Sequence, residues 1–266
     1  MQSRASFFAM IGTVLVLVLA ATGGELRVGM DTRSRPWAFV PELDYSREDF
    51  SKSPQITPAQ VGQLVGVEMD ILSVLARRLG VTPRIVPVAW EQIEAGLVAD
   101  KYDVIMNAWV PSSKTPKEIA ASAAYYDWGL LVVVRSNDTL RSFAELAGKT
   151  VGHFADPSVD RSALSLRAGK LVPFEDSDQL FEALKANTVD AVVEDSTYAR
   201  WRVAKDQQLR IVGEPLNRLG YHLGVRRSNV ELLKSLEAAI KELRASQELA
   251  RIRQRWESAG SPGSLP

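Results

Sequence analysis

Apolar and polar positions change their spacing repeatedly along the chain, so strand-like runs follow helix-like ones. Apolar residues recur three and four positions apart in residues 71–80, and Gly80 stands where a helix is expected to end. Residues 82–87 then have the pattern of a strand. This alternation predicts an α/β protein. The same reasoning predicts further strands at residues 26–30, 129–137, 150–154, 170–173 and 221–229, and helices at 162–168, 230–246 and 247–256.

Two segments of the chain repeat one another at the level of this pattern. Residues 97–109 align position for position with residues 184–196. In each copy a helical period ends at a polar turn, an Asp follows, and three apolar residues form a short strand. The Asp is Asp103 in the first copy and Asp190 in the second. Two copies of one unit indicate two lobes with a cleft between them.

Polar groups follow the strand in both copies, and they are the first candidates for a binding site. Ligands of open α/β sheets bind beyond the carboxyl ends of the strands. The first copy places Asn107, Ala108 and Trp109 there, and the second places Glu194 and Asp195. We expect Asp195 to be the strongest ligand contact, because charge-assisted hydrogen bonds are strong and Glu194 lies on the opposite side of the strand.

The loop after the first strand carries a carboxylate and two aromatic rings. Asp31 follows the strand directly, and Trp37 and Phe39 lie in a stretch without helical or strand periodicity. The rings could stack on a ligand or close over the edge of the core, because amphipathic aromatic residues serve both uses. Trp90, at the start of a later helix, is expected to fill the core.

A second loop, residues 110–118, is rich in hydroxyl and ammonium groups and is predicted to open a helix. Ser112, Lys114 and Thr115 could hold an anionic group together with the N–H groups of the helix end. The alternative is a solvated helix cap with ordinary surface lysines, because capping needs only one of the hydroxyls.

Composition and charge exclude some classes of partner. The 266 residues are 46% hydrophobic, which is enough for a sizeable core, and 32 basic residues balance 32 acidic ones. Nothing in this balance favours nucleic acid, so we expect a small-molecule partner. The chain has no Cys, which excludes disulfides and thiolate metal sites. No cofactor or metal is expected.

The N-terminus has the layout of a secretory signal peptide. Arg4 precedes an apolar run over residues 7–20, and small residues follow. The run is shorter than the roughly 20 residues of a spanning helix, which favours cleavage near Gly23 over a membrane anchor. We expect residues 1–23 to be removed and the mature protein to be a periplasmic monomer.

Two strands that end in the same Arg-Ser-Asn sequence enclose a complete βαβ series. They are residues 129–137 and 221–229. A lobe that is entered and left by two strands has a natural hinge. The expected organisation is a first lobe of residues 25–131 and 221–258, a second lobe of residues 134–219, a surface excursion over residues 41–61 and a disordered tail over residues 259–266.

Four motifs recur in an order and spacing that carry a family resemblance. They are residues 66–71 (GVEMDI), residues 101–105 (KYDVI), the pair Tyr125-Tyr126, and residues 189–195 (VDAVVED). Together they resemble the bacterial extracytoplasmic solute-binding proteins of polar amino-acid uptake systems, family 3, over nearly the whole mature chain. The resemblance implies the periplasmic-binding-protein type II fold, with two α/β lobes joined by a two-strand hinge. It also implies a solute that is delivered to the permease of an ABC transporter in the inner membrane.

The resemblance assigns roles to several candidate residues. It implies an aromatic contact within residues 37–39, an acid that takes the ligand ammonium at Asp195, and a hydroxyl contact at Ser112. The loop that reads Gly-Thr-Thr in the family is Asp-Pro-Ser here, and Ser158 is its candidate contact.

The same comparison reveals departures from the family pattern. Thr115 stands where the family has the Arg that clamps a ligand carboxylate, and Val110 replaces a usual hydroxyl residue. Asp156 adds a negative charge where an α-carboxylate would approach. The nearby Lys114 offers a point charge and not the bidentate fork of Arg. These departures are compatible with a cationic or zwitterionic solute of another shape than an ordinary α-amino acid.

Two other classes of function remain as alternatives. The cyclohexadienyl dehydratases resemble the same fold, and an enzyme of that kind would need a general acid in the cleft, for which Glu194 is the candidate. His153 and His222 lie on strand patterns and are expected to be structural. A ligand-sensing protein is the third class, but such proteins carry a transmembrane or output segment.

Overall fold

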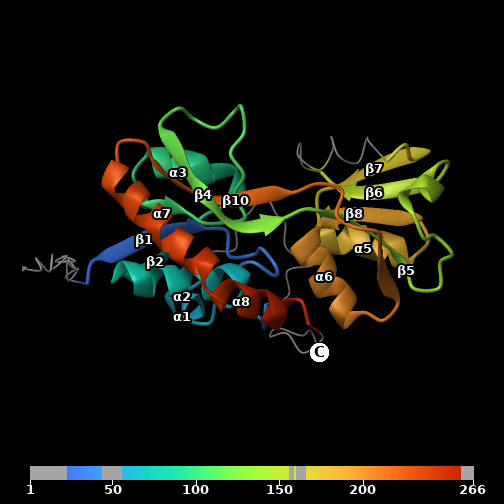
Figure 1. Cartoon of the computed structure of the whole chain (residues 1–266), viewed down its shortest axis with the longest axis horizontal. Helices are drawn as coiled ribbons and strands as arrows, with labels where there is room; N and C mark the ends of the chain where they lie inside the picture. Colours follow the sequence, from blue (N-terminus) through green and yellow to red (C-terminus); the bar gives the residue numbers. More distant parts are fainter. Residues whose placement is uncertain (1–22, 44–55, 156–158, 160–165, 259–266) are drawn as a thin grey trace, which may run out of the picture.

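The computed structural model describes residues 23–43, 56–155, 159 and 166–258, and its strands form two five-stranded sheets (Figure 1). The first sheet lies on the left of Figure 1 and the second on the right, each with its own helices. Both sheets mix parallel and antiparallel strands. The predicted α/β class is confirmed. We call the two sheets with their helices the first and the second lobe.

The first lobe combines segments from both ends of the chain. Its sheet has the order β2-β1-β3-β10-β4, in which β10 is antiparallel to both neighbours. The strands are β1 (Glu25–Met30), β2 (Thr82–Pro87), β3 (Val104–Ile105), β4 (Ile119–Trp128) and β10 (Leu219–Arg226), and the helices are α1 (Pro58–Val61), α2 (Val67–Leu79), η2 (Trp90–Gln92), α3 (Ile93–Val98), α7 (Val230–Ala245) and α8 (Glu248–Trp256).

The second lobe is continuous in sequence. Its sheet has the order β7-β6-β8-β5-β9, in which β6 pairs in parallel with β7 and β8. The strands are β5 (Leu130–Arg135), β6 (Thr150–Phe154), β7 (Lys170–Phe174), β8 (Ala191–Asp195) and β9 (Leu209–Val212), and the helices are η3 (Phe143–Leu146), α5 (Ser177–Lys185) and α6 (Ser196–Lys205).

Two chain segments cross between the lobes, and hydrogen bonds connect them to each other. The first passes from β4 to β5 through Gly129, and the second is residues 213–218 between β9 and β10. The backbone N–H of Leu130 donates to the side-chain oxygen of Asn217 (3.0 Å), and the N–H of Leu216 donates to the carbonyl oxygen of Leu130 (2.8 Å). A Cβ on Gly129 would lie 2.3 Å from the carbonyl oxygen of Asn217, so the close approach of the crossings requires glycine.

The repeated unit seen in the sequence has the same local structure twice. The turn residues Asp100 and Asn187 occupy equivalent positions and have φ angles of 57° and 59°, a region that Asp and Asn tolerate. The side chains of Asp103 and Asp190 then accept a hydrogen bond from a backbone N–H of the neighbouring parallel strand, at 3.0 and 2.8 Å. The repeat therefore fixes the register of β3 against β1 and of β8 against β6.

The prediction of a helix after residues 110–118 is wrong, because strand β4 follows that loop. Residues 119–128 read IAASAAYYDW, and their alanines favour a helix locally. Pairing with β10 along the length of the strand overrides this preference.

Some predictions fall on residues outside the described ones. These are residues 1–22 of the signal peptide, residues 44–55 of the surface excursion, most of the helix at 162–168, and the tail 259–266. Within the described residues, no helix combines the length and apolar character needed to cross a membrane.

Candidate functional site

Asp195 lies where the two lobes meet. It ends β8 and caps α6, and its Oδ1 accepts the backbone N–H groups of Thr197 (2.6 Å) and Tyr198 (3.1 Å). Its Oδ2 accepts a hydrogen bond from the hydroxyl of Tyr221, which belongs to β10 of the first lobe. Burial raises the pKa of Asp195 to about 6, although these hydrogen bonds oppose the rise. One carboxylate therefore links a helix N-terminus of the second lobe to a strand of the first.

Glu194 is the neighbouring carboxyl group, and its side chain contacts a different element. Its Oε2 accepts a hydrogen bond from the Ser177 hydroxyl on α5 (2.7 Å), and its Oε1 accepts the backbone N–H of Asp195 (2.8 Å). Burial raises the pKa of Glu194 to about 8, with a smaller contribution from the charge of Asp195. Glu194 is therefore largely protonated at neutral pH.

Asp31 and Asn107 lie together at the carboxyl ends of β1 and β3. The backbone N–H of Asp31 donates to the side-chain oxygen of Asn107 (2.6 Å). The Asp31 carboxylate forms a buried ion pair with Arg33 (2.7 Å), and it also accepts the backbone N–H of Trp90 (3.2 Å). The Asp31 and Arg33 side chains are only 7% and 6% exposed. Asp31 thus ties the loops after β1 and β2 together.

Glu68 is a buried acid that the sequence reasoning did not identify. Its Oε1 accepts the backbone N–H of Ala108 (2.5 Å) and the hydroxyl of Tyr125. Its Oε2 is buried and has no hydrogen-bond partner among the described residues. Burial raises the pKa of Glu68 to about 7. The available signal was its place on the apolar face of α2, because a carboxyl group there needs a partner.

The loop after β3 is organised around the carboxylate of Glu94 on α3. Glu94 Oε1 accepts hydrogen bonds from the indole N–H of Trp109 (3.0 Å) and the hydroxyl of Thr115 (2.9 Å). The turn is closed by the backbone N–H of Ser112, which donates to Thr115 Oγ1 (3.0 Å), and by that of Lys114, which donates to Ser112 Oγ (3.1 Å). Trp109 is buried, whereas Ser112 and Lys114 are exposed.

Trp37 and Phe39 belong to the packed interior of the first lobe. Trp37 is 6% exposed and makes edge contacts with Tyr126 and Tyr221, with ring centroids 5.6 and 5.0 Å apart. Phe39 is 1% exposed and packs edge-on against Trp256. Trp37 therefore supports the tyrosine that contacts Asp195, and Phe39 fixes α8.

Trp90 was expected to fill the core, and this prediction is wrong. Its side chain is 42% exposed, although its backbone N–H is bonded to the buried carboxylate of Asp31. It starts η2, the element that follows β2, at the same edge of the sheet as Asn107. The exposed aromatic ring at this edge is Trp90, and not the rings of residues 37–39.

Both histidines engage backbone carbonyl oxygens through Nδ1. His153 lies 3.0 Å from the oxygen of Phe154, and His222 lies 2.7 Å from that of Ser122. Within the described residues, no group of three or more His, Cys, Asp or Glu side chains could hold a metal ion. Ser158 lies outside the described residues.

Comparison with protein families gives a match over most of the chain. The model of the bacterial extracellular solute-binding proteins, family 3, matches residues 51–259. The match includes the repeated unit, both crossing segments and Asp195.

Curated relatives are similar over most of their own length. The L-cystine-binding protein TcyJ of Escherichia coli (strain K12) is 25% identical over 199 residues, covering 73% of this chain and 75% of that protein. The histidine-binding periplasmic protein of Salmonella typhimurium is 24% identical over 244 residues, covering 87% of this chain and 94% of that protein.

Solved structures share the two-lobed fold. A mutant of the arginine-binding protein ArgBP from T. maritima has a TM-score of 0.64 and 29% identity, covering 88% of this chain and 95% of that one. An ancestral cationic amino acid solute-binding protein has a TM-score of 0.70 and 24% identity, covering 88% and 96%. The type II periplasmic-binding-protein fold is therefore confirmed.

Proposed function

The chain belongs to the bacterial extracellular solute-binding proteins, family 3, and from this membership we propose that it captures a small amine-bearing solute between its lobes and delivers it to an ABC transporter. Relatives named for binding cystine, histidine and arginine support an amino acid or a close analogue as the solute. The signal-peptide pattern of residues 1–23 and the periplasmic relatives support action in the periplasm. The proposed partner is the permease of that transporter.

The observation that carries the proposal is the position of Asp195 between the lobes. Its Oδ1 accepts two backbone N–H groups, its Oδ2 accepts the Tyr221 hydroxyl, and the Thr197 hydroxyl also interacts with the carboxylate. We propose that a ligand N–H replaces the weaker of the hydroxyl contacts to this carboxylate, those of Thr197 and Tyr221. A ligand ammonium at this position would gain a charge-assisted hydrogen bond in a buried setting.

The loop after β3 supports an amine more than a carboxylate as the recognised group. Glu94 places a negative charge beside the Thr115 hydroxyl, so a ligand carboxylate at that point would be repelled. Lys114 is exposed and can supply only a point charge. We propose that the rest of the contact surface comes from Trp90, Asn107 and Ser112, together with Ser158 of the Asp-Pro-Ser sequence.

Binding without catalysis is the function that the family supports. Glu194, the candidate acid of the dehydratase alternative, is buried and hydrogen-bonded to Ser177 and to the Asp195 backbone. The relatives are named as binding proteins. We therefore expect the solute to be recovered unchanged.

The test begins with mass spectrometry of small molecules released when the purified protein is denatured. The identified solute should raise the melting temperature, and Asp195→Asn should weaken its binding by about 1.5 to 3 kcal/mol. Glu231→Gln, on the exposed start of α7, is the matched control and should bind as the wild type does. Unchanged affinity in Asp195→Asn would refute the proposed contact. Turnover of prephenate or arogenate that is lost in Glu194→Gln would favour the enzyme.

A further inference from the structure

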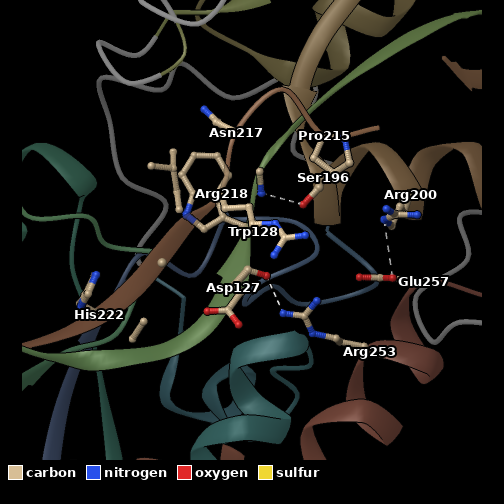
Figure 2. A pocket seen from close by; sticks show the side chains of 14 residues that line it. Asp127, Trp128, Ser196, Arg200, Pro215, Asn217, Arg218, His222, Arg253 and Glu257 are labelled. Atoms are coloured by element: carbon tan, nitrogen blue, oxygen red, sulfur yellow. Dashed lines mark hydrogen bonds and ion pairs between the residues drawn. The ribbon is translucent and has the colours of Figure 1, made fainter. Parts of the chain in front are cut away.

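A cavity of about 700 Å³ lies at the hinge, with walls from both lobes (Figure 2). The cavity is open to solvent on one side. Trp128 and Gly129 line it from the first crossing and Asn217 from the second, while Arg200 comes from α6 and Arg253 from α8. A molecule in this cavity would touch both lobes and both crossing segments.

The cavity borders the surroundings of Asp195, but the Asp195 side chain does not line it. Gly220 and His222 of β10 line the cavity, whereas Tyr221, between them, contacts Asp195. Successive residues of a strand face opposite sides of the sheet. Gly220 and His222 therefore face away from the Asp195 carboxylate, whereas Ser196, which follows Asp195, and Trp128, which stacks on Tyr221, form the part of the wall next to it.

Three arginines line the cavity, and they come from three different parts of the chain. Arg200 belongs to the second lobe, Arg218 to the second crossing and Arg253 to the first lobe. Arg218 is exposed. Arg253 is held in place, because it donates to the carbonyl oxygen of Asp127 (2.5 Å) and its guanidinium lies 4.1 Å from the centre of the Tyr126 ring.

Two acidic residues also line the cavity, and the carboxylate of each lies close to an arginine side chain. Asp127 forms a bidentate pair with Arg244, at 2.8 and 3.0 Å, and Arg244 does not line the cavity. Glu257 lies 3.8 Å from Arg200. The cavity surface therefore carries three guanidinium groups against two carboxylates, one of which is already neutralised from outside.

Trp128 is the aromatic residue of the cavity wall. The indole N–H of Trp128 is buried and has no hydrogen-bond partner among the described residues. The Trp128 ring is fixed by stacking on Tyr221, at 4.8 Å between centroids. The indole N–H is enclosed by protein atoms, so Trp128 contributes its ring, and not a donor, to the cavity surface.

We propose that the hinge cavity binds a small oxyanion, with phosphate or carboxylate oxygens, and that this ligand connects the two lobes. Guanidinium groups bind such oxygens in pairs of parallel hydrogen bonds. Arg200 belongs to the second lobe, Arg253 to the first lobe, and Arg218 to the crossing segment between them. A rotation of the lobes changes the spacing of these groups, so a bound anion favours the lobe angle at which all of them reach it. By linkage, the anion also changes the affinity for a solute on the Asp195 side.

The test is calorimetric titration of the full-length mature protein with inorganic phosphate and, separately, with citrate, at an ionic strength fixed by sodium chloride. We expect saturable binding of one anion per chain, and the anion that binds more tightly identifies the oxyanion group. Arg218→Gln and Arg253→Gln should each weaken binding about tenfold or more. Arg251→Gln is the matched control, because Arg251 is an exposed residue of α8 that does not line the cavity. It should bind as the wild type does.

Two results would overturn the proposal: no saturable binding of either anion, or unchanged binding in both cavity variants. Arg218 is exposed, so Arg218→Gln should keep the melting temperature of the wild type and separate loss of binding from loss of folding. Asp195→Asn should leave anion binding intact. Failure at the hinge and failure at the proposed solute site are therefore distinguishable.

Discussion

Replacement of Glu194 by Gln should change how the stability of the protein depends on pH. The pKa of Glu194 is about 8 in the folded protein and has an ordinary value of 4.5. Between these values the folded state binds more protons than the unfolded state, so the free energy of unfolding falls as the pH rises. At about 1.4 kcal/mol per pH unit, this one group removes roughly 3 kcal/mol between pH 5 and pH 8.

The Gln side chain can replace both hydrogen bonds, because its oxygen accepts the Asp195 N–H and its amide can donate to the Ser177 hydroxyl. Urea unfolding followed by circular dichroism at pH 5, 6.5 and 8 measures the effect. The variant should be more stable than the wild type at pH 8, and its stability should fall less steeply. Glu237→Gln, exposed on α7, is the control and should follow the wild type. Equal slopes in Glu194→Gln and wild type would refute the argument from burial.

Three further substitutions test contacts between and within the lobes. Tyr221→Phe removes the hydroxyl bonded to Asp195 and should lower the free energy of unfolding by about 1 to 3 kcal/mol in urea; an unchanged midpoint would contradict the interlobe bond. Arg33→Met leaves the buried Asp31 carboxylate without its ion-pair partner and should cost about 3 kcal/mol in the same assay, and a neutral effect would argue against the pair. Gly66→Ala places a Cβ 1.9 Å from a backbone carbonyl oxygen at a φ of 149°, so the melting temperature should fall by several degrees, and wild-type melting would show that the backbone can shift.

Local patterns predicted most of the elements because each depends on residues close in sequence. Gly80 ends α2 in the left-handed conformation (φ 66°), as its position after the last apolar residue indicated. The repeated units were recognisable because Asp103 and Asp190 each serve the same backbone contact. The predicted strand at residues 82–87 coincides with β2.

The site was harder to predict because its contacts join distant segments. Nothing near Glu68 in sequence indicates that it accepts hydrogen bonds from Ala108 and Tyr125. Trp37 and Trp90 are both aromatic residues beside polar loops, yet one is 6% and the other 42% exposed. The difference arises because Trp37 packs on Tyr126 and Tyr221, which reach it only after the sheet has formed.

The position of β10 in the first sheet determines the order in which the two lobes can complete their sheets during synthesis. In the first sheet β10 (residues 219–226) lies between β3 and β4 and pairs with both. All five strands of the second lobe, β5 to β9, precede β10 in the sequence and are therefore synthesised before it. Until then β3 and β4 each keep an unpaired edge, which is a site for mispairing. A chain that emerges N-terminus first therefore completes the second lobe while the first is still open. The first lobe, whose synthesis starts first, is therefore the last to complete its sheet.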